Sequence, residues 1–199
     1  HHHDHTGGNL ELKRATGCTI VGNAHDAARI PGIDVRVADG DVIALGTAQA
    51  RVLDVSGHTI GHIAYWFEEA GALFCGDTLF SLGCGRLFEG TPSQMWASLS
   101  RLRELPPEVR VYCGHEYTES NARFALQIDP DNPSLRRRAE EVKRLRAKGL
   151  PTVPSVLGEE RAANPFLRAD DARLQQAAGL AGDDPVAAFA EIRRRKDAF

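Results

Sequence analysis

The sequence predicts an α/β domain followed by a helical C-terminal part, and two observations support this prediction. In the first 118 residues, short β-rich runs alternate with turns and a few helical stretches. After residue 118 the chain holds four stretches of helical character, separated by joints that contain Pro and Gly. Strands followed by helices indicate an α/β core with a helical addition. We therefore expect two domains, one over residues 1–118 and one over residues 119–199.

Helices are predicted at two places in the first domain and at four places in the second. Residues 10–15 follow two glycines and form a short helix, and residues 78–91 have no regular period and form a structured loop. Pro92 begins a helix that runs to about Leu105. One face of this helix carries Met95, Leu99 and Leu102. The helices of the second domain are expected over residues 119–128, 134–148, 170–178 and 185–195.

Seven β-rich runs are predicted as strands, over residues 18–21, 35–37, 42–45, 48–55, 62–67, 73–75 and 109–113. Three residues able to bind metal follow such runs on loops: His58, Asp77 and His115. Strand ends are where α/β proteins place functional side chains. One such histidine alone is more often structural than a ligand, but three residues in equivalent positions reverse that expectation. His62 is expected to support a ligand rather than to be one.

The composition is that of an ordinary globular protein. Of the 199 residues, 42% are hydrophobic, 26% charged and 7% aromatic, which excludes both a disordered and a membrane-embedded chain. The formal net charge of -3 provides no general basic field for nucleic acid or an anionic membrane. No apolar run reaches the roughly 18 residues needed to cross a bilayer. We expect a cytoplasmic monomer that acts on a small molecule, without a nucleic-acid or membrane partner.

The cysteines support the same compartment. Cys18, Cys75, Cys84 and Cys113 are far apart and form no CxxC pair. They are predicted to be reduced thiols rather than a disulfide framework or a thiolate zinc site. The glycines around Cys84 invite a nucleophile interpretation, but the sequence places no positive group beside it, so a role in packing is favoured.

A compact set of nitrogen and oxygen donors begins the chain: His2, Asp4 and His5. A strand cannot point two neighbouring side chains the same way, so we expect this set on a loop that leaves a strand end. Gly7 and Gly8 then allow a tight turn into the next helix. The leading histidines could also be the remnant of a purification tag, but Asp4 and the residues after it follow without any linker.

Histidines and carboxylates without thiolates suit zinc, iron or manganese. Donors for nearly two ions are present, and an aspartate could bridge them. Two ions ~3.5–4 Å apart lower the pKa of a bridging water and polarise a substrate carbonyl. The sequence therefore predicts two divalent metal ions, with zinc as the first expectation and iron or manganese as alternatives.

The loops that carry these residues match the metallo-β-lactamase superfamily, and within it the sequence resembles the glyoxalase II (hydroxyacylglutathione hydrolase) family. The signature T-H-x-H-x-D-H aligns on Asp4 and His5, places its second histidine at His2 and leaves its first histidine one residue before His1. The Gly-Cys-Gly-Arg loop and the C-terminal Arg-Arg-x-Lys-Asp segment are more specific to the family than the metal motifs. The resemblance covers the whole chain and includes residues 57–62, 76–80, 83–86, 88–91, 112–118, 164–168 and 193–199.

The resemblance implies an αββα sandwich that lacks its first strands, with a helical C-terminal domain that binds glutathione. In the family a metal-bound hydroxide attacks the thioester of S-D-lactoylglutathione and releases glutathione and D-lactate, the second step of methylglyoxal detoxification. With the opening strands outside the sequence, we expect an uncovered apolar sheet face and poor activity of residues 1–199 alone. Asp77 and Asp4 are the implied catalytic residues. Two metal sites are implied to share Asp77, one formed by the preceding histidine with His2 and His58, the other by Asp4, His5 and His115.

The same resemblance places the glutathione contacts at Arg86, Phe88, Tyr117, Arg193 and Lys196. Phe88 stands where many members carry tyrosine, which removes one hydroxyl contact to the peptide. Arg193 and Lys196 are three residues apart and share one face of a helix. A basic run near a helix C-terminus often only complements the helix dipole, but the resemblance favours a clamp for a carboxylate.

Two alternatives stay open. Persulfide dioxygenases of the same superfamily use a related fold and a single iron bound by two histidines and one aspartate, although the tail with Arg193 and Lys196 argues against this activity. The second alternative is an inactive fragment, because one expected ligand and the opening strands are absent from the sequence.

Overall fold

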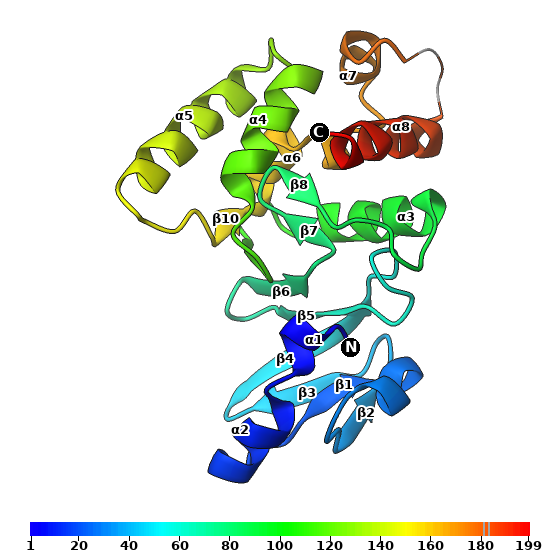
Figure 1. Cartoon of the computed structure of the whole chain (residues 1–199), viewed down its shortest axis with the longest axis vertical. Helices are drawn as coiled ribbons and strands as arrows, with labels where there is room; N and C mark the ends of the chain where they lie inside the picture. The colour runs from blue at the N-terminus through cyan, green and yellow to red at the C-terminus, as the bar shows by residue number, and fades with distance from the viewer. Residues whose placement is uncertain (181, 183) are drawn as a thin grey trace.

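The computed structural model describes residues 1–180, 182 and 184–199 and has a six-stranded mixed sheet at its centre (Figure 1). In spatial order its strands are β10 (Ser155–Val156), β9 (Arg110–Cys113), β6 (Ala72–Gly76), β5 (Ile63–Phe67), β4 (Ala48–Asp54) and β3 (Val42–Leu45). β6 and β9 are parallel, and the other neighbouring pairs are antiparallel. The parallel pair matters for function because it brings the carboxyl ends of two strands to the same edge.

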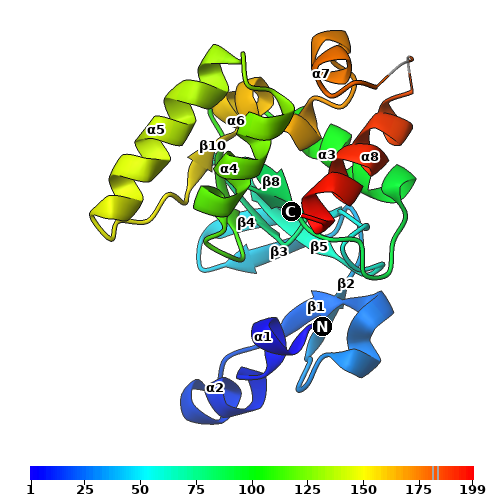
Figure 2. The ribbon, with the colours of Figure 1, turned by 45° about the horizontal axis from the view of Figure 1, so that its top comes forward.

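The remaining elements of the first part are short: α1 (His3–Thr6), α2 (Asn9–Thr16), β1 (Val21–Asn23), the 3-10 helix η1 (Ala24–Arg29), β2 (Val35–Val37), β7 (Leu79–Phe80) and β8 (Gly83–Cys84). β1 and β2 pair in parallel and are connected by η1, while β7 and β8 form an antiparallel hairpin. Leu82, in the turn of this hairpin, has a φ of 57°. Figure 2 shows α1, α2, β1 and β2 on one side of the main sheet and the later helices on the other.

The later helical elements are α3 (Pro92–Arg103), α4 (Thr118–Ile128), α5 (Pro133–Ala147), α6 (Leu157–Ala163), the 3-10 helix η2 (Pro165–Leu167), α7 (Ala172–Ala177) and α8 (Pro185–Asp197). α3 begins with a capping box between Thr91 and Gln94 and a proline at its first turn. α8 begins where the Asp184 side chain accepts two backbone amides. No helix in the described part of the chain is both long enough and apolar enough to cross a membrane.

The core lies between the sheet and the later helices. Alternation along β5 buries Ala64 and Trp66 in one continuous cluster with Met95 of α3 and with Phe189 of α8. Tyr65, which points to the other face, contacts the Val21 carbonyl of β1 at 3.5 Å. That other face keeps exposed apolar side chains at Leu45 and Phe74.

The predicted class, an α/β domain with a helical C-terminal part, is confirmed, and most predicted elements agree with the observed bounds to within about two residues. The strand expected over residues 18–21 is wrong in position, because only Val21 belongs to β1. The loop expected over residues 78–91 contains the β7–β8 hairpin. The loop expected for His2, Asp4 and His5 is wrong for Asp4 and His5, which lie in α1, whereas His2 precedes this helix. The prediction missed η1, β10, α6 and η2, which are short and have no clear period.

Candidate active site

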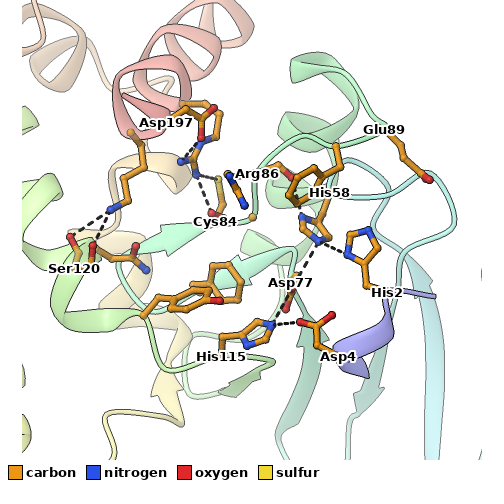
Figure 3. Close-up of a pocket in the computed structure, with 17 residues that line it drawn as sticks. His2, Asp4, His58, Asp77, Cys84, Arg86, Glu89, His115, Ser120 and Asp197 are labelled. Atoms are coloured by element: carbon orange, nitrogen blue, oxygen red, sulfur yellow. Dashed lines mark hydrogen bonds and ion pairs between the residues drawn. The ribbon is translucent and has the colours of Figure 1, made fainter. Parts of the chain in front are cut away.

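The predicted metal-binding side chains meet at one edge of the main sheet, although they come from four segments (Figure 3). Asp77 follows β6 and His115 follows β9, and the parallel pairing of these two strands places their ends side by side. His58 lies on the loop between β4 and β5. The N-terminal segment with α1 adds His2, Asp4 and His5. All six residues that the sequence nominated as ligands are therefore brought together.

The Asp77 carboxylate lies at the centre of this cluster. Its Oδ2 atom is 3.2 Å from His5 Nε2, 3.3 Å from His115 Nε2 and 3.5 Å from His58 Nε2. Its Oδ1 atom is buried and has no hydrogen-bond partner. A buried, unpartnered carboxylate oxygen is costly unless it binds a ligand. This observation indicates that the site holds a group that the carboxylate contacts.

The donors divide into two groups around Asp77. Donor atoms of Asp4, His5 and His115 all lie within 4.8 Å of one another, and His58 Nε2 is 3.3 Å from His2 Nδ1. Nitrogen atoms of two imidazoles at this distance, together with carboxylate oxygens, form the donor set that divalent metal ions prefer. The residues present therefore fit divalent metal binding.

Hydrogen bonds to other groups fix which ring nitrogen of two histidines carries a proton. His58 Nδ1 is 2.8 Å from the Arg86 carbonyl, which can only accept, so Nδ1 donates and Nε2 keeps its lone pair toward Asp77. Burial lowers the pKa of His58 below its ordinary value. His62 Nε2 accepts the Asp77 backbone amide at 3.0 Å, and burial lowers the pKa of His62 to about 4. His62 thus holds the backbone of Asp77 and has no free nitrogen facing the cluster.

A cavity of about 640 Å³ extends from this cluster to α8. Its wall includes all five residues expected to contact glutathione: Arg86, Phe88, Tyr117, Arg193 and Lys196. The Phe88 and Tyr117 side chains are 55% and 51% exposed, and the Tyr117 ring stacks on His115 with centroids 5.0 Å apart. The cavity therefore joins the predicted metal-binding side chains to a basic wall.

The two basic residues of α8 have different surroundings. Arg193 is 5% exposed, donates to the Cys84 carbonyl at 2.9 Å and forms an ion pair with Asp197 at 2.8 Å. Lys196 is less buried and contacts the Ser120 carbonyl at 3.4 Å. Arg193 thus links α8 to the β7–β8 hairpin, while the ammonium of Lys196 remains on the cavity wall.

Cys84 has the character of a packing residue. It is buried, and desolvation raises the pKa of its thiol to about 11 even though Arg193 lies nearby. All four cysteines are free, as predicted. A thiol that stays protonated near neutral pH is a weak nucleophile.

The structure adds residues that the sequence did not nominate. Ser120 and Asn121, at the start of α4, line the cavity, and the Asn121 side chain donates to the Ser81 carbonyl at 3.1 Å. Asp26 and Glu89 lie next to the metal-binding loops. The sequence signal for Ser120 and Asn121 was their position shortly after the Tyr117-Thr118 segment.

Comparisons with known proteins agree with this geometry. Residues 1–115 match the family described as the metallo-beta-lactamase superfamily, and residues 116–199 match the family described as the hydroxyacylglutathione hydrolase C-terminus. Proteins named hydroxyacylglutathione hydrolase from Rhodospirillum rubrum and Methylococcus capsulatus are each 62% identical over 199 residues. That alignment covers 100% of this chain and 78% of each relative.

Solved structures show the same fold at lower identity. ETHE1 from Myxococcus xanthus has a TM-score of 0.64 and is 28% identical, over 97% of this chain and 64% of that one. TTHA1623, solved in a di-iron-bound form, has a TM-score of 0.55 and is 27% identical, over 83% of this chain and 73% of that one.

Proposed function

The chain belongs to the hydroxyacylglutathione hydrolases of the metallo-β-lactamase superfamily, and on this premise we propose that it hydrolyses S-(2-hydroxyacyl)glutathione thioesters. S-D-lactoylglutathione is the proposed substrate, and glutathione and D-lactate are the products. One observation carries the proposal: metal-binding side chains converge on the Asp77 carboxylate at one end of a cavity whose other end is basic. That arrangement matches a substrate with a reactive thioester and an anionic peptide.

The chain binds divalent metal, and the proposed number of ions is two. His2 and His58 would hold one ion, Asp4, His5 and His115 the other, and Asp77 lies between the two groups. The di-iron form of TTHA1623 supports a pair of ions in this fold. Zinc, iron and manganese all suit the donors. When bound, such a pair supplies a water that ionises near neutral pH and polarises the thioester carbonyl.

Groups of the protein itself orient the side chains that would hold the ions. The Arg86 carbonyl fixes the His58 ring, and His62 fixes the backbone of Asp77. Desolvation alone would raise the pKa of Asp4, but its own backbone amide and the nearby histidines hold it below the ordinary value. The ionised Asp4 carboxylate, 59% exposed and 3.3 Å from His115 Nε2, would serve as an oxygen donor to the ion that it shares with His5 and His115. The thiolate of glutathione leaves without a protein acid.

The peptide part of the substrate would lie along the basic wall. Lys196 and Arg86 offer cationic donors to its carboxylates, and Tyr117 offers a hydroxyl. Arg193, whose guanidinium already binds the Cys84 carbonyl and Asp197, contributes by holding the wall in place. Specificity for the glutathionyl group therefore depends on residues of this wall rather than on the proposed metal ligands.

The direct test compares two thioesters on the metal-loaded protein. Release of free thiol from S-D-lactoylglutathione is expected to exceed release from the lactoyl thioester of a small thiol by at least about tenfold in kcat/KM, since one lost charged contact corresponds to about 1.4 kcal/mol. Oxygen uptake with glutathione persulfide is measured in parallel. Equal rates on both thioesters would refute peptide recognition, and oxygen uptake without hydrolysis would refute the proposed reaction.

Substrate affinity is expected to fall at alkaline pH. Burial and the neighbouring Arg193 lower the pKa of Lys196 to about 8, so its ammonium is charged at neutral pH and loses its proton as the pH rises through about 8. A substrate carboxylate prefers the charged form, so KM should rise up to about tenfold across this range while kcat changes little. Steady-state kinetics against pH measure this. The Lys196→Arg variant stays charged and should lose the rise; an unchanged rise would show that another group causes it.

A further inference from the structure

A network of charged residues outside the ligand set holds the loop that carries His58. We propose that Asp26, Arg29 and Glu89 are positioning residues for the metal centre, because together they fix the His58 loop (residues 57–62) from two sides. The inference rests on the proposed metal site and adds to it a support that lies outside the residues in contact with metal.

The first side of the His58 loop is held by η1. Asp26 is 2% exposed and lies directly against Gly61, where any Cβ would overlap the carboxylate. The Asn23 side chain donates to the Gly61 carbonyl at 2.8 Å. Burial alone would raise the pKa of Asp26, but hydrogen bonds from His25 and Arg29 hold it below its ordinary value. The loop backbone therefore packs against a buried carboxylate that stays ionised.

The second side of the His58 loop is held by the segment after β8. Glu89 accepts the Ile60 backbone amide through Oε2 at 2.9 Å. The backbone amides of Phe88 and Glu89 donate to the His58 carbonyl at 3.1 and 3.4 Å. The carboxylate of Glu89 thus binds the loop two residues from the imidazole that faces the cluster.

Arg29 joins the two sides. Its guanidinium donates to Asp26 at 2.6 Å and to Glu89 at 2.5 Å. Glu89 is 60 positions away from Arg29 in the sequence. A planar fork of donors can bind two carboxylates at once, which an ammonium does less well. With the bridge present, the two carboxylates cannot move apart, and the loop between them is held in one position.

Displacing the His58 loop would disturb the centre at two points. His58 presents Nε2 to the cluster, and His62, at the other end of the loop, accepts the Asp77 backbone amide at 3.0 Å. Both the ring of one ligand and the backbone of the central carboxylate therefore depend on the loop. Loss of groups that orient metal ligands commonly weakens metal binding by about 10–100-fold.

The test measures Zn²⁺ affinity by competition with a chromophoric chelator, in the full chain. Arg29→Ala should raise the dissociation constant for Zn²⁺ by about tenfold or more and alter the visible absorption of the Co²⁺-loaded protein. Glu89→Gln, which keeps an acceptor for the Ile60 amide, should bind more tightly than Glu89→Ala. The matched control is Arg103→Ala, because Arg103 also forms a long-range ion pair, with Asp170 at 2.7 Å, but lies outside the cavities around the metal-binding side chains.

The outcomes separate the possible failures. Wild-type affinity in Arg29→Ala would overturn the positioning role, as would an equal loss in Arg103→Ala, which would indicate a general loss of stability. A wild-type chain that binds no Zn²⁺ or Co²⁺ would overturn the proposed metal site and this inference with it.

Discussion

Replacing Asp77 with alanine is expected to remove metal binding and to lower kcat/KM by more than about 10³-fold. Asp77 Oδ2 lies within 3.5 Å of a nitrogen atom of three histidines, and among the described residues it is the carboxylate that lies between both groups of donors. The loss should exceed the 10²–10³-fold cost of removing one donor that stabilises an oxyanion, since the carboxylate contributes to holding the ions themselves. Metal content per chain and steady-state hydrolysis are the measurements.

Two variants make this result interpretable. Asp77→Asn keeps the shape of the side chain and removes its charge, so it should fold and still lose metal. Asp39→Ala removes an exposed carboxylate that pairs with Arg101 on the surface and should leave both metal content and rate unchanged. Retention of two metals and of wild-type turnover in Asp77→Ala would refute the shared role of this residue.

Gly85→Ala is expected to disturb the proposed metal site, because the added Cβ would displace the backbone next to it. A Cβ at this position would overlap the Asp77 carbonyl oxygen and come within 3.0 Å of His58 Nδ1. Relief of the overlap must shift the backbone of one ligand or the ring of another, since neither is the free end of a flexible side chain. We expect a stability cost of about 1–3 kcal/mol and a loss of about 100-fold in kcat/KM.

Gly8→Ala is the matched control for this variant. A Cβ on Gly8 would meet no atom within 4 Å, and the backbone there has a φ of -86°, which alanine adopts freely. The control should therefore keep wild-type melting temperature and rate. If Gly85→Ala behaves like Gly8→Ala, the close contact with Asp77 does not limit the site.

The residues proposed as metal ligands could be nominated from the sequence because several of them have a local signal. Asp77 and His115 follow apolar runs, and His58 stands among glycines, so each marks the point where a strand gives way to a loop. These local signals do not indicate that β6 pairs in parallel with β9, which is what brings the ends of the two strands together. The resemblance to a known family supplied that step.

The supporting residues could not be predicted because their partners are distant in sequence. Arg29 and Glu89 are 60 positions apart, and nothing near either residue indicates the other. The same holds for Glu160 of α6, whose buried carboxylate accepts the Leu82 amide at 2.7 Å across 78 positions. Such contacts are decided by tertiary packing, and the helix that carries Glu160 was itself missed for lack of length and period.

The buried thiol of Cys84 has a consequence for chemistry in an oxidising cell. Thiol–disulfide exchange requires a thiolate, and a thiol with a pKa of about 11 is ionised to about one part in ten thousand at pH 7. Glutathione disulfide entering the cavity beside Cys84 would therefore find almost no nucleophile to attack it. At Cys84 the cavity is thus lined by a thiol that is poorly suited to form a mixed disulfide with a glutathionyl ligand.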